Sequence, residues 1–226
     1  MSIKKSPPTF AELAPQYWQL FLDCQVCPDK LAAVKLMVTN ITINRQRYLK
    51  VAPMLGTMPW WFIALVHAME SSLSFSHHLH NGDPLKARTH HVPAGRPPAN
   101  PRANPKVAPS AKNPYTWEES AEDALRWMRL NSWSDWSIRG ALYKLEEYNG
   151  WGYRMYHSDV LSPYLWSYTN KYTKGKYAAD GKWNDQLVSA QPGAAAILRL
   201  MVDSGLVLAY DYLGDYPLPP AGTAYA

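Results

Sequence analysis

Apolar residues recur at helical spacing along the first part of the chain. Thr9 and Glu12 form a T-x-x-E capping box ahead of an apolar stripe that starts at Leu13, a pattern that predicts a first helix. The apolar positions keep the same period over residues 28–51, so a second and longer helical segment is expected there.

A third helix is expected over residues 60–70, with Thr57 and Pro59 as its N-cap and first turn. Its sequence, WWFIALVHAME, is apolar on nearly every side until Glu70. Such a helix is typical of a core position, where it is buried against several neighbours. The sequence therefore predicts a buried helix that ends in one carboxylate.

The pattern changes after this helix. Residues 71–114 contain eight prolines, two glycines and five histidines but few bulky aliphatic residues, which predicts a loop with at most a short hairpin. Within it, residues 92–115 are low in complexity and consist mainly of Pro, Ala, Asn, Lys and Arg. We expect them to form an extended, Pro-rich basic insertion with no fold of its own.

Helical spacing returns in the second half of the chain. A helix is expected after a second capping box at Thr116 and Glu119, and another over 134–148, stopped by Asn149-Gly150. Residues 151–190 are rich in Tyr, Trp and Gly and are expected to be irregular. A last helix is expected over 192–203. The predicted fold class is mainly α. A single domain is expected over residues 1–226, in which residues 1–56 supply N-terminal helices.

The composition, 47% hydrophobic and 18% charged, excludes wholesale disorder and predicts a packed core. The apolar stretches are shorter than a bilayer-spanning helix, and the N-terminal residues lack the apolar run of a secretory signal. Neither stable membrane insertion nor a signal sequence is therefore expected. Cys24 and Cys27 form a lone C-x-x-C without a second ligand pair, so we expect two reduced thiols and no cofactor.

The net charge of +5 is confined to one segment of the chain. Residues 71–117 hold six basic side chains and one acidic side chain, Asp83, whereas the rest of the chain holds 17 of each sign. A uniformly basic surface of the kind that coats nucleic acid is therefore not expected. The basic loop suits either a solvated linker or attraction to an anionic surface, such as a cell wall or an outer membrane.

Three residues around the start of this segment have the chemistry of a glycosidase. A carboxylic acid at the end of an apolar helix, Glu70, is expected to keep its proton near neutral pH and to serve as a general acid. Asp83 lies in a polar Asn-Gly-Asp turn, where a carboxylate stays ionised and either activates water or stabilises an oxocarbenium-like transition state. The hydroxyl of Thr89 would position that water.

Together these motifs resemble the lysozyme superfamily. Glu70-Ser71 at a helix end resembles the catalytic pair of goose-type lysozymes and lytic transglycosylases, and Asp83 and Thr89 resemble the Asp and Thr of the phage-type Glu–Asp–Thr triad. More broadly, residues 57–200 are similar to phage and prophage endolysins of the lysozyme family. The resemblance implies a lysozyme-like helical domain with a small hairpin and loop region.

The sequence Glu147-Tyr148-Asn149-Gly150 resembles the A-Y-N-x-G segment that lines the sugar groove of the transglycosylase branch. The residues expected to bind substrate, as ring-stacking, amide or cationic groups, are Tyr148, Asn149, Trp151, Tyr153 and Arg154, and further stacking rings are expected at Tyr164 and Trp166. Aromatic planes suit the C–H faces of pyranose rings, and Arg154 would serve the carboxylates of muramic acid units.

The predicted function is that of a peptidoglycan-degrading endolysin, an N-acetylmuramidase that hydrolyses the β-1,4 bond between MurNAc and GlcNAc. The resemblance implies a monomer that acts on glycan strands, binds no nucleic acid, and stays in the host bacterial cytoplasm until a holin gives it access to the wall.

Three alternatives stay open. Glu70 acting alone would make the protein a lytic transglycosylase, with the 6-hydroxyl of the substrate as nucleophile. A zinc-dependent amidase or peptidase that cleaves the peptide part of the wall is the second alternative. Six of the seven histidines lie within residues 67–91, and His67 and Glu70 form an H-x-x-E pair, a spacing found in some zinc peptidases and amidases. A non-catalytic wall-binding module is the third alternative.

Overall fold

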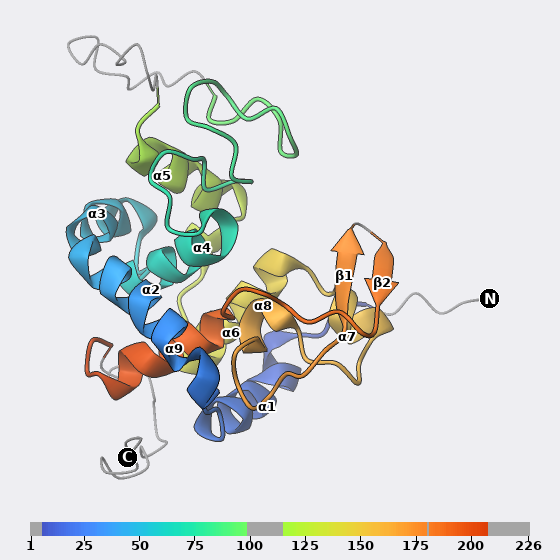
Figure 1. Ribbon diagram of the computed structural model, residues 1–226. Helices are drawn as coiled ribbons and strands as arrows, with labels where there is room; N and C mark the ends of the chain where they lie inside the picture. The colour runs from blue at the N-terminus through green and yellow to red at the C-terminus, as the bar shows by residue number, and fades with distance from the viewer. Residues whose placement is uncertain (1–5, 99–114, 180, 208–226) are drawn as a thin grey trace, which may run out of the picture. The chain divides into compact units, whose positions relative to one another are not determined.

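The computed structural model describes residues 6–98, 115–179 and 181–207 (Figure 1). These residues form nine α-helices and one two-stranded antiparallel sheet, which confirms the mainly α class. The helices are α1 (Phe10–Leu22), α2 (Leu31–Ile43), α3 (Arg45–Val51), α4 (Trp60–Ser71), α5 (Trp117–Trp127), α6 (Ile138–Asn149), α7 (Gly152–Tyr156), α8 (Pro163–Trp166) and α9 (Ala194–Asp203). The strands are β1 (Lys176–Ala179) and β2 (Lys182–Asn184), and single 3₁₀ turns lie at Pro28–Lys30, Ala52–Leu55 and Leu130–Ser132.

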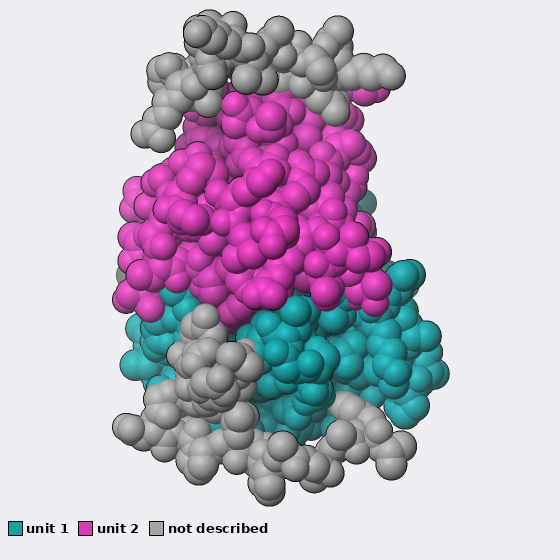
Figure 2. Space-filling view, turned by 90° about the vertical axis from the view of Figure 1, so that its left-hand side faces the viewer, with its two compact units in different colours: residues 1–38, 135–226 teal, residues 39–134 magenta. Residues whose placement is uncertain are grey.

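The chain divides into two compact units, which Figure 2 shows in two colours. Unit 1 comprises residues 1–38 and 135–226, and unit 2 comprises residues 39–134. The N-terminal residues 1–56 are thus shared between the two units, since the division falls within α2.

Unit 2 is built around α4, which contacts α3, while α3 in turn contacts α5. All nine residues from Trp61 to Met69 are buried, as the apolar sequence predicts. At its centre the ring of His67 lies 4.5 Å from those of Phe75 and Trp117, measured between ring centroids. Helix α4 is therefore the core element of this unit, and Glu70 is the charged residue in its last turn.

Unit 1 is held together by α1 against α6, α6 against α8, and α8 against α9. The close approach of α8 and α9 requires a glycine at position 193, because a Cβ atom there would lie 2.3 Å from the carbonyl oxygen of Leu165. Between α8 and α9 the chain forms the β1–β2 hairpin, in which Tyr177 pairs with Trp183. This hairpin lies in the segment that the sequence pattern predicts to be irregular.

The local signals for helix starts are confirmed in two places and wrong in two. Thr9 and Thr116 both form complete capping boxes. The predicted N-cap at Thr57 is wrong, because the helix begins at Trp60 after Pro59, whose extended backbone takes the N-cap position. The helix expected from residue 134 begins at Ile138, where the Ser137 hydroxyl accepts the N–H of Gly140.

The segment after α4 contains turns and one isolated bridge between His77 and Pro84, with no helix or strand over residues 72–98. Residues 99–114, and with them most of the predicted Pro-rich loop over 92–115, lie outside the described residues.

Within the described ranges, no single helix has the length and apolar character to cross a membrane, although the sharply bent pair Arg45–Leu55 and Trp60–Ser71 meets both criteria when taken together. Cys24 is buried and Cys27 is half-buried, and both thiols are free. Burial raises the pKa of the Cys24 thiol to about 12, so this group is an unreactive thiol at neutral pH.

Candidate functional site

Glu70 lies in the last turn of α4, where the helix ends abruptly. Ser72 and Leu73 both adopt left-handed backbone angles, with φ of 50° and 62°. The N–H groups of both residues point back to the carbonyl oxygen of His67 and close the C-terminus of the helix. Glu70 is half-buried at this end, where the apolar helix meets the polar loop that follows.

The turn that carries Asp83 packs against the same helix end. Gly82 has φ of 76°, and a Cβ atom at this position would lie 3.3 Å from the carbonyl oxygen of Glu70. The turn is closed by hydrogen bonds from the N–H of Gly82 to His78 O (2.9 Å) and from the N–H of His78 to Asp83 O (2.6 Å). The structure therefore brings the backbone of Glu70 next to the Asn81-Gly82-Asp83 turn, and the catalytic roles of Glu70 and Asp83 stay predictions.

The carboxylate of Asp83 is buried and surrounded by hydrogen-bond donors. Its Oδ2 accepts the backbone N–H groups of His90 (2.8 Å) and His91 (3.0 Å) and the side-chain amide of Asn81 (3.1 Å). Its Oδ1 lies 2.6 Å from Nδ1 of His91. Burial by itself would raise the pKa of Asp83, but the hydrogen bonds from His91 and His90 outweigh it and hold the pKa well below its ordinary value.

The reason why Asp83 is ionised differs from the expected one. The sequence pattern predicts an Asp83 that stays ionised in a polar, wetted turn. The turn is polar, yet the residue is only 4% exposed, and N–H donors rather than solvent surround the carboxylate. The charge therefore depends on the position of the His90-His91 backbone.

Thr89 is buried, and its hydroxyl takes part in the structure of the loop. It donates to the carbonyl oxygen of Pro93 (2.5 Å) and accepts the N–H of Arg96 (2.9 Å). Arg96 is in turn held by a bidentate contact with Asp123 of α5 and lies over the ring of Trp127. These contacts fix the loop; the role of Thr89 in positioning water stays a prediction.

The histidines of this unit have different environments. His67 is fully buried, its Nδ1 lies 3.0 Å from the hydroxyl of Tyr48, and burial lowers its pKa to about 4. It is therefore a core residue, and the H-x-x-E spacing with Glu70 does not place a solvent-facing imidazole beside that carboxylate. His78 is also buried, with its ring nitrogens bonded to Ser120 and Ala87.

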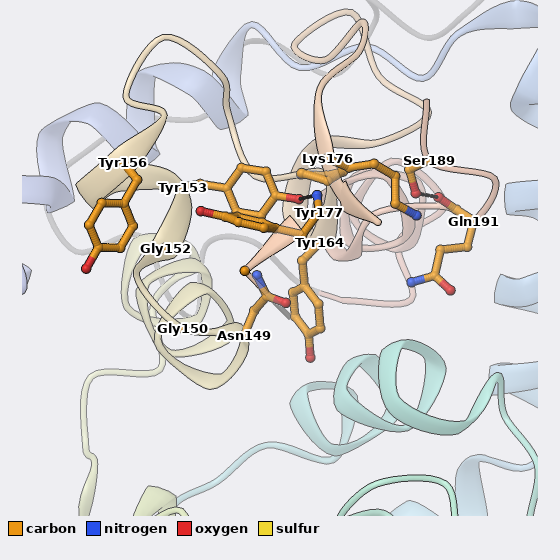
Figure 3. Close-up of a pocket in the computed structure, with 12 residues that line it drawn as sticks. Asn149, Gly150, Gly152, Tyr153, Tyr156, Tyr164, Lys176, Tyr177, Ser189 and Gln191 are labelled. Atoms are coloured by element: carbon orange, nitrogen blue, oxygen red, sulfur yellow. Dashed lines mark hydrogen bonds between the residues drawn. The ribbon is translucent and has the colours of Figure 1, made fainter. Parts of the chain in front are cut away.

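Unit 1 contains a separate pocket of about 490 Å³ (Figure 3). It is lined by Asn149 and Gly150 at the end of α6, Tyr153 of α7 and Tyr164 of α8. These residues belong to the predicted groove motif and stacking set, and their binding of substrate stays a prediction. The remaining lining residues are Gly152, Tyr156, Pro163, Lys176, Tyr177, Gly181, Ser189 and Gln191. Phenolic rings, amides and one cation thus surround a space whose volume is in the range of small-molecule binding sites.

Other predicted binding residues lie elsewhere in unit 1. Trp151 packs its ring against Tyr143, with centroids 5.2 Å apart, and Tyr148 is half-buried on α6. Arg154 forms an ion pair with Glu146, whose side chain is only 2% exposed. Trp166 is fully buried in the core. None of these four residues is among those that line the pocket.

Comparisons of the chain with protein-family models, with curated proteins and with solved structures give no match.

Sequence reasoning missed Lys176 and Tyr177, which lie on β1 at the pocket. Lys176 is the cationic group among the described lining residues, the role that was expected of Arg154. A usable signal was present in the sequence, because Asp180-Gly181 between KYAA and KWN is a typical two-residue hairpin turn. This signal would have predicted two paired strands here, with β1 as one of them, instead of an irregular segment.

Proposed function

We propose that the protein is a lysozyme-like N-acetylmuramidase that hydrolyses the MurNAc–GlcNAc bond of peptidoglycan, with Glu70 as the general acid. The observation that carries the proposal is the approach of the Asp83 turn to the end of a buried helix at Glu70, where Gly82 faces the Glu70 carbonyl oxygen. Glycosidases of this type need a carboxylic acid and a second, ionised carboxylate near one another.

The hydrogen bonds around Asp83 favour an electrostatic role for it in this proposal. Backbone N–H groups and the His91 ring hold it as an anion, and a carboxylate that is stabilised in this way is a weak proton acceptor. Asp83 therefore acts through its charge, by stabilising the positive charge that develops on the sugar ring, rather than by removing a proton from water.

In this proposal the pocket of unit 1 by itself binds a sugar unit of the glycan. The rings of Tyr153, Tyr164 and Tyr177 offer faces and hydroxyls to a pyranose ring, and Asn149 offers an amide that suits an N-acetyl group. Lys176 would pair with the lactyl or peptide carboxylate of a muramic acid unit. In this proposal the partners are peptidoglycan glycan strands, and a holin gives the enzyme access to them from the host cytoplasm.

The environment of Asp83 also favours a second candidate, a lytic transglycosylase. Since the carboxylate is already engaged by four N–H donors, Glu70 can act as acid and then base while the 6-hydroxyl of MurNAc attacks the anomeric carbon. The two reactions leave different ends on the glycan. Mass spectrometry of the products separates them, because 1,6-anhydro-MurNAc ends arise from the transglycosylase alone.

The central test is Glu70→Gln assayed by loss of turbidity of purified peptidoglycan. We expect the rate to fall by about 100-fold or more, since general acid catalysis contributes that much. Glu122→Gln is the matched control, because Glu122 is another helical glutamate in unit 2, paired with Arg126. A folded Glu70→Gln protein with full activity would overturn the proposal.

A further inference from the structure

Asp83, His90 and His91 form a compact group at the surface of unit 2. One ligand atom from each residue lies within 4.8 Å of the others. The Asp83 side chain is 5% exposed, whereas those of His90 and His91 are 65% and 71% exposed. The two imidazole rings lie next to each other, with centroids 3.9 Å apart, on the solvent side of the buried carboxylate.

The two oxygens of the carboxylate have separate roles. Oδ2 accepts two backbone N–H groups and the amide of Asn81, which fix the plane of the carboxylate. Oδ1 faces the ring of His91, with Nδ1 at 2.6 Å, while Nδ1 of His90 lies 3.2 Å from Oδ2. A ligand carboxylate in a metal site is typically oriented in this way by hydrogen bonds to its second oxygen.

We infer that Asp83, His90 and His91 bind one first-row transition-metal ion of the Zn²⁺ class. Bonds of about 2.0–2.2 Å to oxygen and nitrogen place neighbouring ligand atoms roughly 3.3 Å apart around a tetrahedral ion. The separation of 2.6 Å between Oδ1 of Asp83 and Nδ1 of His91 reaches this value by a small rotation of the exposed His91 ring. The exposed His90 ring, whose Nδ1 now lies 3.2 Å from Oδ2, would turn towards the same ion on Oδ1. Two imidazoles and one carboxylate favour Zn²⁺, Co²⁺ or Ni²⁺ over Mg²⁺ and Ca²⁺.

The site has a consequence that rests on the proposed function. An ion bound to Asp83 neutralises the negative charge that the muramidase would use to stabilise its transition state. Zn²⁺ is therefore expected to inhibit glycan hydrolysis, and the inhibition should require the residues that bind the ion. Metal binding itself is independent of any catalytic activity.

The test uses the full chain without an affinity tag, titrated with Co²⁺ and then with Zn²⁺. Tetrahedral Co²⁺ gives visible absorption bands much stronger than those of six-coordinate Co²⁺, and competition with a chelating dye gives the affinity. We expect one ion per chain and at least a tenfold loss of affinity in both His90→Ala and His91→Ala. His77→Ala is the matched control, since the His77 ring is bonded to Ser74 in the same segment, and it should bind as the unmodified chain does.

Both histidine substitutions are at exposed side chains, so the variants are expected to fold. Absence of saturable binding to the unmodified chain, or equal affinity in His91→Ala, would overturn the metal site. Glu70→Gln separates this inference from the proposed function, because it should bind the ion with unchanged affinity even where glycan cleavage is lost. Activity that requires added Zn²⁺ would instead support the site and overturn the proposed metal-independent hydrolysis.

Discussion

Gly82 approaches the carbonyl oxygen of Glu70 so closely that a Cβ atom at position 82 would lie 3.3 Å from it. The contact joins the turn that carries Asp83 to the helix end that carries Glu70. Because both sides of the contact are backbone, the spacing does not depend on side-chain rotamers. The relative position of the two proposed catalytic residues is thus determined in part by the absence of a side chain between them.

Gly82→Ala should therefore lower both stability and activity. The left-handed backbone at φ of 76° and the tight contact with Glu70 together are expected to lower the free energy of unfolding by about 1–2 kcal/mol. Gly95→Ala is the control, since Gly95 has φ of 80° but its Cβ would meet nothing within 4 Å. Chemical denaturation should show that both variants lose stability through backbone strain. Turbidity assays should show reduced specific activity in Gly82→Ala alone.

How far the sequence predicts the structure depends on how local each signal is. The capping boxes at Thr9 and Thr116 are complete within four residues, and both helices start where they predict. The buried helix before Glu70 is equally readable, because its apolar pattern has no polar face. These elements follow from interactions between near neighbours in the chain.

The sites depend on contacts that local patterns do not contain. Asp83 is buried because the backbone of His90 and His91 folds back over its carboxylate, and nothing in the Asn-Gly-Asp turn predicts that. The pocket joins Asn149 of α6 to Lys176 of β1 through tertiary packing. Arg154, four residues from Gly150, instead pairs with a buried glutamate that no sequence spacing singles out.

Arg154 is expected to contribute to stability rather than to substrate binding. It pairs with Glu146, which also accepts a 2.5 Å hydrogen bond from the hydroxyl of Tyr17. Arg154→Met would leave a buried carboxylate without its cation, and we expect the free energy of unfolding to fall by about 3 kcal/mol. Denaturant titration measures this loss.

The double variant Arg154→Met, Glu146→Gln separates the two roles. Removal of both charges should restore part of the lost stability. In the single variant, part of the loss comes from the buried Glu146 carboxylate that has no cation, and the double variant removes that charge. An Arg154→Met protein with unchanged stability and weaker glycan binding would contradict this assignment and support the role predicted from the sequence.

His67 is expected to make stability depend on pH in the acid range. Burial lowers its pKa to about 4 in the folded protein, against an ordinary value near 6.5. Between these values the unfolded chain binds a proton that the folded protein does not, so stability is present in full above pH 6.5 and falls as the pH falls towards 4. As the pH falls through this range, the titration of His67 lowers the free energy of unfolding by about 3 kcal/mol.

The measurement is the free energy of unfolding between pH 4 and 7 for the unmodified chain and for His67→Gln. The variant should be less stable at pH 7, since its Tyr48 contact changes, but its stability should vary less steeply with pH. His77→Gln, at a partly exposed histidine, should retain the original slope. Equal slopes in the chain and in His67→Gln would show that His67 titrates normally.

Lys176 is expected to select substrates that carry a carboxylate. It lies on β1 at a pocket whose described lining residues include no acidic side chain. In Lys176→Gln the dissociation constant for soluble MurNAc-containing fragments should rise roughly three- to fivefold, the size of one partly exposed ion pair. Calorimetric titration in the Glu70→Gln background measures binding without turnover.

Chitin oligosaccharides make the prediction specific, because they share the N-acetyl sugar ring but lack the lactyl carboxylate. Their affinity should be the same with Lys176 or Gln at this position, and added salt should weaken only the muramic acid ligands. Lys182→Gln is the matched control, since Lys182 lies on the neighbouring strand β2, is exposed, and does not line the pocket. An equal loss of affinity for both ligand classes would mean that Lys176 supports the hairpin rather than pairing with the substrate, and the assignment of the pocket to muramic acid would then fail.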